Sequence, residues 1–220
     1  PASLGDAIVA MRAARLAACA EAAATARPVY VIGTEVPTPG GAIEALDHLQ
    51  PTRPEAVLAT YDVHEQAFHA VHAQAFHDVA NRAWERVIAI VVQPGVEFGH
   101  EDVVFYAPER ARALVAALDR MPGLVFEAHS TDYQPEVALR QLVQDGFAVL
   151  KVGPALTFAL REALYGLDAI AAVLRPGAAS LTATMERLMT AEPKDWQGHY
   201  RGTPEDQRRL RHHSLSDRIR

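Results

Sequence analysis

The chain alternates short apolar runs with longer segments of helix-forming residues, and this alternation constrains its fold more than any other feature. Runs rich in Val, Ile, Leu and Phe occur four times, at 29–35, 87–95, 123–130 and 147–155. Their nearly continuous apolar character is typical of parallel strands buried on both faces. Because helical segments separate and follow these runs, the chain is predicted to be an α/β protein with a parallel sheet.

The helices are predicted from composition and from signals at their ends. Residues that favour helices, such as Ala, Leu, Arg and Glu, dominate these segments. Pro108 is predicted to lie in a first helical turn and Gly146 at a helix C-terminus. The predicted helices cover about 4–26, 54–86, 108–119, 135–146 and 156–174, followed by a helical and irregular remainder. A long polar loop is predicted after the second strand.

Two α/β architectures fit this order, an open doubly wound sheet and a (β/α)8 barrel (TIM barrel). Polar residues decide between these two architectures. Each predicted strand has a polar residue at or near its C-terminal end, and by the alternation of side chains along a strand these residues point to one face of the sheet. These residues are Glu35, Gln93, Glu127 with His129, and Lys151. A barrel gathers such residues at the mouth formed by the C-terminal ends of its strands. The shared face of these polar residues therefore favours the barrel.

A closed barrel of this type needs eight strands, and the sequence supplies four. We therefore expect residues 1–220 to form a single domain, the C-terminal half of a TIM barrel with its four parallel strands and helices, plus a C-terminal helical extension. Composition is compatible with this, since 220 residues at 50% hydrophobic content can build a sizeable core.

Charge and cysteine content exclude several classes of protein. A formal net charge of −6 argues against a nucleic-acid-binding protein, which would carry basic clusters. The single cysteine, Cys19, excludes an internal disulfide and is more typical of a reducing compartment. The sequence has no apolar run long enough for a transmembrane helix and no signal-peptide pattern, so a cytoplasmic protein that does not bind membranes is expected.

The polar residues at the strand ends could carry chemistry. Carboxylates and a histidine in one cavity, here Glu35, Glu127 and His129, can bind a divalent metal or transfer protons. Lys151 beside them could hold a phosphate or polarise a carbonyl group. In "KVGPALT", Gly153 would allow backbone N–H groups to approach a phosphate. The competing interpretation is a structural network of buried ion pairs at the strand ends.

Several familiar motifs are absent. The histidine-rich stretch "HEQAFHAVHAQAFH" lacks the HExxH spacing of zinc proteases, because Phe68 occupies the place of the second histidine. Its histidines are expected to spread around a helix and face solvent. The sequence contains neither a nucleotide-binding glycine loop nor a Gly-x-Ser-x-Gly elbow.

Five strings together identify a resemblance that covers nearly the whole chain. They are "VYVIGTEVPTPGGA", "VVQPGVEFGHEDV", "FEAHSTDYQ", "LRQLVQDGFAVLKVGPALTFALREALYGL" and "SDRIR". The chain closely resembles the non-catalytic (Z) subunits of class II tagatose-1,6-bisphosphate aldolase, the GatZ/KbaZ type. This resemblance implies a (β/α)8 barrel about twice as long, whose N-terminal half carries a Gly-Asp-His motif that this chain lacks.

The resemblance also implies a function. Such subunits support the stability and full activity of a separate, zinc-dependent catalytic aldolase subunit in galactitol, N-acetylgalactosamine or tagatose catabolism, so an oligomer that binds a sugar phosphate is expected. The alternative is an enzyme in its own right, a metal-dependent ketohexose-phosphate 4-epimerase or aldolase. Tagatose-6-phosphate kinase, also ascribed to the family, is the weakest alternative, because the sequence offers no phosphate-binding signature for phosphoryl transfer.

A working hypothesis assigns roles to the strand-end residues. Glu35 and His129 would bind zinc or another divalent metal, with further ligands from the absent half. Glu127 would transfer a proton. Substrate would be bound by Gln93, Lys151 and Gly153, of which the last two would hold a phosphate or the C2 oxygen. One departure stands against independent aldolase activity, since "EAHSTD" lacks the glycines that flank the zinc histidines of the catalytic subunits.

Overall fold

The computed structural model describes residues 2–23, 28–34, 49–75 and 83–218. The helices are α1 (Leu4–Ala23), α2 (Pro54–Ala75), α4 (Pro108–Ala116), α5 (Glu136–Gln144), α6 (Pro154–Leu174), α7 (Leu181–Ala191) and α8 (Pro204–His213), with short 3-10 turns η2 (Ala117–Arg120) and η3 (Pro193–Asp195). The strands are β1 (Tyr30–Ile32), β2 (Val87–Val92), β3 (Glu97–Phe98), β4 (Val103–Val104), β5 (Val125–Ala128) and β6 (Val149–Leu150).

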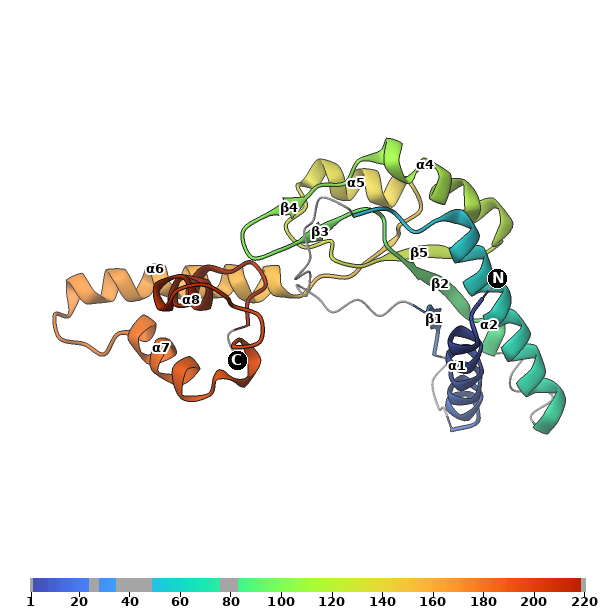
Figure 1. Ribbon diagram of the computed structural model, residues 1–220, viewed down its shortest axis with the longest axis horizontal. Coiled ribbons are helices and arrows are strands. Elements are labelled where there is room, and N and C mark those ends of the chain that lie inside the picture. The colour runs from blue at the N-terminus through green and yellow to red at the C-terminus, as the bar shows by residue number, and fades with distance from the viewer. Residues whose placement is uncertain (1, 24–27, 35–48, 76–82, 219–220) are drawn as a thin grey trace.

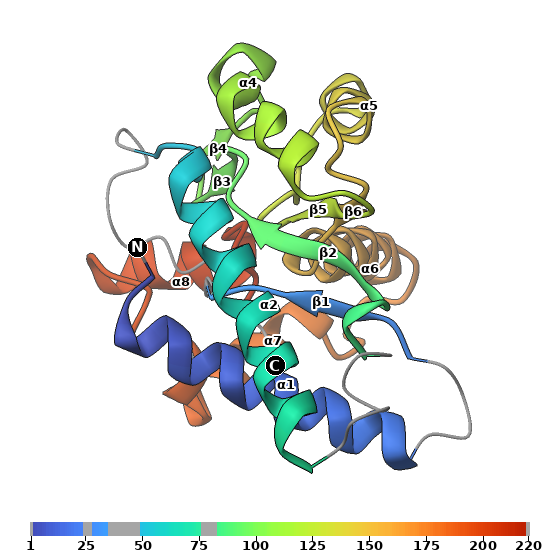
Figure 2. The ribbon, with the colours of Figure 1, turned by 90° about the vertical axis from the view of Figure 1, so that its right-hand side faces the viewer.

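Four strands form a parallel sheet in the order β1-β2-β5-β6, which confirms the α/β prediction (Figure 2). The order along the sheet follows the order along the chain. A doubly wound sheet reverses its strand order at a switch point, whereas a barrel adds each strand beside the previous one. The order of the described strands is compatible with one sector of a barrel.

The core lies between the helices and one face of the sheet. The strands contribute Ile32, Ile90, Val92, Phe126 and Ala128, each at most 3% exposed. The helices cover them with buried side chains that include Val57, Phe68, Leu114 and Leu142. Helices α2, α4 and α5 lie along this face, and α1 packs on α2 (Figures 1 and 2). Gly146 has φ +91° after α5 and Pro108 begins α4, as the sequence predicted.

The opposite face of the sheet is more open within the described part of the chain. Val31 is 41% exposed, and Val91, Val125 and Val149 are half-buried. Glu127 lies on the same face, because it is two residues after Val125. This is the face on which the polar residues at the strand ends were predicted to lie.

The loop expected after β2 contains a short antiparallel hairpin, in which Glu97 pairs with Val104 and Phe98 with Val103. The two strands have only two residues each, so their alternation is too short to be recognised in the sequence. Both Glu97 and Phe98 are buried.

Helix α6 leaves the sheet and packs with α7 and α8 as a C-terminal extension (Figure 1). A second small core of Met189, Trp196, Tyr200 and Leu210 holds this extension together. The other side of α6 carries apolar side chains that are 42–78% exposed, namely Leu156, Leu160, Leu164, Leu167, Ile170, Val173 and Leu174. None of the described helices is long and apolar enough to cross a membrane.

One expectation about the histidine-rich helix is wrong. His64 is fully buried, and its Nδ1 donates to the Thr60 carbonyl oxygen at 2.8 Å. The first turns of α1 cover this side of α2, so a position expected to face solvent lies in a helix–helix contact. Burial lowers the pKa of His64.

Candidate functional site

The strand register brings the predicted residues to one end of the sheet. Glu127 of β5 pairs with Val91 of β2 on one side and with Val149 of β6 on the other. Two residues further along each strand are Gln93, His129 and Lys151, which therefore form the next row across the same face. The Lys151 N–H still donates to the Ala128 carbonyl oxygen at 2.9 Å, so the parallel pairing reaches this row.

Glu127 and His129 form the centre of the candidate site. His129 Nε2 lies 2.8 Å from Glu127 Oε1, and their side chains are 7% and 16% exposed. A carboxylate oxygen only accepts hydrogen bonds, so Nε2 carries the proton in this contact. The remaining ring nitrogen, Nδ1, is then the atom through which His129 would bind a substrate or a metal. A carboxylate that fixes a histidine in this way is the usual support of both catalytic and metal-binding histidines.

Glu97 of β3 is a second acidic group at this site, and it was not predicted from the sequence. It is 8% exposed, and its Oε1 accepts the Phe98 N–H at 3.0 Å. Burial raises the pKa of Glu97, while a hydrogen bond from Ser130 and the proximity of His129 act in the opposite direction. The available signal was a glutamate inside the otherwise apolar "GVEFG".

Asp132 joins the loop after β5 to the start of α6. Its Oδ1 accepts the N–H of Gly153 at 2.8 Å and of Ala155 at 2.9 Å. The carboxylate, which is 3% exposed, thus satisfies two of the N–H groups that the helix itself leaves unpaired. The Gly153 N–H predicted to approach a phosphate is therefore bonded to Asp132 in this structure.

The other two predicted substrate-binding side chains differ in environment. Gln93 Oε1 accepts hydrogen bonds from the N–H groups of Gly95 and Val96 at 2.8 and 3.0 Å, so the Gln93 side chain stabilises the loop that follows it. Lys151 is exposed at the strand end and keeps its ammonium group available to solvent or a ligand. Its carbonyl oxygen accepts the Thr131 hydroxyl at 3.0 Å.

A metal site is not complete within the described residues. They contain no group of three or more His, Cys, Asp or Glu side chains arranged to hold an ion, whereas a catalytic zinc takes about three protein ligands. Glu35 lies outside the described residues. Binding of zinc or another divalent ion by Glu35 and His129 stays a prediction that requires further ligands.

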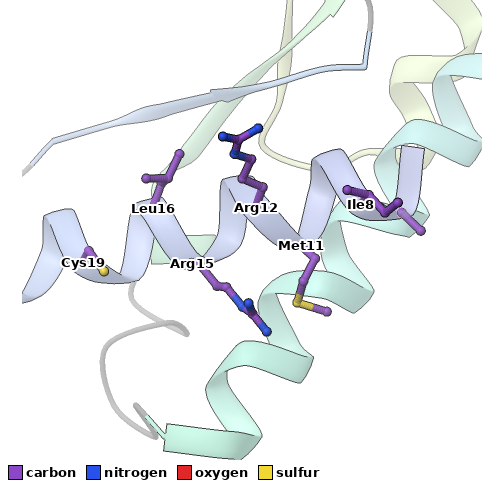
Figure 3. A pocket seen from close by; sticks show the side chains of 7 residues that line it. Ile8, Met11, Arg12, Arg15, Leu16 and Cys19 are labelled. Carbon is purple, nitrogen blue, oxygen red and sulfur yellow. The ribbon is translucent and has the colours of Figure 1, made fainter. Parts of the chain in front are cut away.

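Two hollows are lined by residues in the described part of the chain. One, of about 310 Å³, is beside the ends of β1 and β2 and is lined by Asp6, Val91 and the hydroxyls of Thr34, Thr52 and Thr60, among others. The larger, of about 580 Å³, is lined by α1 side chains alone, including Arg12, Arg15 and Cys19 (Figure 3). Neither contains the Glu127–His129 pair, so the candidate site is the strand-end row.

Comparisons with known proteins find relatives in both sequence and structure. A relative from Agrobacterium fabrum (strain C58 / ATCC 33970), named D-tagatose 6-phosphate 4-epimerase, is 54% identical over 226 residues, which is 100% of this chain and 52% of the relative. A crystal structure from Sinorhizobium meliloti 1021, described as a probable tagatose 6 phosphate kinase, is 52% identical with a TM-score of 0.86. The match covers 100% of this chain and 51% of the chain in that crystal structure. This chain therefore spans about half the length of these relatives. The sequence profile described as "D-tagatose-1,6-bisphosphate aldolase subunit GatZ/KbaZ-like" matches residues 1–220, and the chain therefore belongs to the GatZ/KbaZ-like family.

Proposed function

We propose that this chain forms half of a (β/α)8 barrel that interconverts ketohexose phosphates by inverting C4. The observation that carries the proposal is the buried Glu127–His129 pair at the C-terminal end of a parallel sheet, where barrel enzymes hold their catalytic residues. The sequential strand order and the open inner face of the sheet support a barrel. The name of the Agrobacterium relative supports the reaction and tagatose 6-phosphate as the substrate.

The chemistry of the substrate limits the mechanism. In a 2-ketohexose the carbonyl at C2 makes the hydrogen on C3 acidic, but not the hydrogen on C4. Cleavage of the C3–C4 bond is a route to inversion that needs no redox cofactor and uses the C2 carbonyl directly. The C4 hydroxyl loses its proton, C4 becomes an aldehyde, and the electron pair of the broken bond forms an enediolate over C2 and C3. After the aldehyde turns its other face, the bond forms again and the C4 oxygen recovers the proton.

The strand-end residues match the needs of these steps. The Glu127 carboxylate would take the proton of the C4 hydroxyl and return it, while the His129 Nε2–H bonded to Glu127 fixes its position. The exposed Lys151 ammonium group would stabilise negative charge on the C2 oxygen or hold the 6-phosphate. The low exposure of the two side chains reduces access of water, which would otherwise protonate the enediolate at C3 and prevent the C3–C4 bond from forming again.

A role as an accessory aldolase subunit is the second candidate. The family description itself names an aldolase subunit, and the exposed apolar side of α6 is the kind of surface that a protein partner covers. A catalytic class II aldolase subunit would be that partner. Phosphoryl transfer to tagatose 6-phosphate, which the name of the Sinorhizobium protein suggests, finds less support, because the N–H of Gly153 already donates to Asp132.

One experiment separates these functions. Full-length protein is incubated with tagatose 6-phosphate, and fructose 6-phosphate formation is followed. It is also incubated with tagatose 1,6-bisphosphate, with and without the catalytic aldolase subunit, and triose phosphate release is followed. Formation of fructose 6-phosphate by the protein alone supports the epimerase. An effect confined to the partner's triose phosphate release supports the accessory subunit and contradicts the epimerase.

A further inference from the structure

Residues 214–217, the C-terminal strap, follow α8 and lie against segments that come after the strands of the sheet. Ser214 and Ser216 are 1% and 4% exposed, and Asp217 is 8% exposed, so the strap is buried although it belongs to no helix or strand. It contacts three segments that each follow a different strand of the sheet. These contacts are to His100 in the β3–β4 turn, to Tyr133 in the loop after β5 and to Arg161 in α6.

His100 holds the first part of the strap. Its carbonyl oxygen accepts the Leu215 N–H at 2.9 Å, and its Nδ1 lies 3.0 Å from the Ser214 hydroxyl and 3.2 Å from the Ser216 hydroxyl. Its Nε2 lies 3.3 Å from the His199 carbonyl oxygen, which only accepts, so Nε2 donates and Nδ1 accepts from the serines. Both ring nitrogens of His100 are therefore hydrogen-bonded.

Tyr133 holds the middle of the strap. Its hydroxyl donates to the Leu215 carbonyl oxygen at 2.6 Å, so both backbone polar groups of Leu215 are bound by βα loops. The ring packs edge-on against Phe98 of β3 and Phe158 of α6, with centroids 5.4 and 5.9 Å apart. Tyr133 thus connects the hairpin, the loop after β5, α6 and the strap.

Arg161 of α6 holds the end of the strap through a buried ion pair with Asp217. The two side chains are 6% and 1% exposed, and Arg161 Nε also donates to the His212 carbonyl oxygen at 3.1 Å. The strap therefore cannot move without separating two buried charges.

The loop that contains Tyr133 has a backbone conformation that contacts from other segments must hold in place. Ser130 and Tyr133 have φ values of +56° and +61°, a region that L-residues with side chains rarely adopt. Between them lie Thr131 and Asp132, and His129 directly precedes them. Such a backbone persists only when its surroundings fix it.

We propose that the C-terminal strap sets the position of the loop 129–133, and that Tyr133 is the positioning residue that transmits this constraint to His129 and Asp132. The consequence for turnover rests on the proposed epimerase function, whereas the consequence for loop order does not. The helical extension of this chain is then part of the active-site architecture.

The test compares Tyr133→Phe with Tyr106→Phe in the full-length protein. Tyr106 is the matched control, because its hydroxyl also makes a short hydrogen bond, 2.7 Å to Asp145, but does not contact the strap. Hydrogen–deuterium exchange of the amides of 129–134 should accelerate about fivefold in Tyr133→Phe, the effect of one lost hydrogen bond, and remain unchanged in Tyr106→Phe. Asp217→Asn, which weakens the strap without touching the loop, should accelerate exchange of the same amides.

Kinetics supply the second readout. Tyr133→Phe should lower kcat for epimerisation about fivefold or more with KM within about twofold, because a displaced proton-transfer pair affects the transition state more than binding. Unchanged loop exchange in both Tyr133→Phe and Asp217→Asn, or equal acceleration in Tyr106→Phe, would overturn the strap proposal. Absence of epimerase activity in the wild type would instead overturn the proposed function, and the exchange result would still decide the role of the strap.

Discussion

The Asp132 carboxylate caps the helix of the next βα unit, with Oδ1 at 2.8 Å from the Gly153 nitrogen and 2.9 Å from the Ala155 nitrogen. These two hydrogen bonds therefore hold the loop after β5 against the start of α6. Glu127 lies in β5 and His129 directly after it, and Lys151 directly follows β6, three residues before α6 begins. The cap consequently constrains the spacing between the Glu127–His129 pair and Lys151.

Asp132→Ala is expected to destabilise the fold by about 1–3 kcal/mol, since two buried N–H groups lose an ionised acceptor. Asp132→Asn should cost less, because asparagine also caps helices. Urea unfolding of both variants measures these losses. Asp168→Ala is the control, since Asp168 accepts the Leu181 and Thr182 N–H groups at the start of α7, in the C-terminal extension. Equal destabilisation in Asp168→Ala and Asp132→Ala would contradict a larger contribution from the buried Asp132 cap.

The ion pair of Arg161 and Asp217 should show strong coupling, because both side chains are buried. Either Arg161→Met or Asp217→Leu alone leaves an unpaired buried charge and is expected to cost about 3–5 kcal/mol. The double variant should be less destabilised than the sum of the single variants by about 2 kcal/mol or more. A double-mutant cycle by urea unfolding provides the value. Additive effects would show that the two charges do not stabilise each other.

The pH dependence of stability should report Glu97. Burial raises the pKa of Glu97 in the folded state above its value in the unfolded chain. The folded protein therefore holds this proton more tightly, and the stabilisation is complete below the unfolded pKa and is lost as the pH rises through the folded pKa. Glu97→Gln keeps the neutral form, so its stability relative to wild type should increase between about pH 4 and about pH 8. A difference that is constant or decreases over this range would contradict a raised pKa.

The predicted metal site can be tested by elemental analysis of full-length protein. If Glu35 and His129 are ligands, wild-type protein should contain about one divalent ion per chain, and His129→Ala should lose most of it, because removing one of a few ligands costs most of the affinity. His69→Ala, at an exposed position of α2, is the control. Metal content that is absent from wild type, or unchanged in His129→Ala, would contradict the predicted ligands.

Much of the fold could be predicted because it depends on local patterns. The four central strands were recognisable from continuous apolar runs, and Gly146 and Pro108 marked the ends of helices through their backbone preferences. The polar residues at the strand ends could be assigned to one face, because side chains alternate strictly along a strand. The observed register pairs Glu127 with Val91 and Val149, and Gln93, His129 and Lys151 each follow these three residues by two positions; that they form one site stays a prediction.

Long-range contacts could not be predicted in the same way. Glu97 is brought to the site by a hairpin of two-residue strands, and Asp132 caps a helix that begins 22 residues later in the chain, at Pro154. His64 was expected in solvent because its helix has no clear apolar side, and only the packing of α1 on α2 buries it. In each case the environment comes from a segment distant in sequence.

The decisive measurement for the proposed epimerase is the rate at which full-length protein converts tagatose 6-phosphate into fructose 6-phosphate, for wild type, Glu127→Gln, His129→Ala and Glu136→Gln. Glu136 is the matched control, since it is also paired with a basic side chain, Arg140, but on the exposed surface of α5. We predict a measurable rate for wild type and Glu136→Gln and a loss of about 10²–10⁴-fold for the two site variants, the usual contribution of a proton-transfer group. A wild type without activity, or site variants as active as Glu136→Gln, would contradict the proposed function.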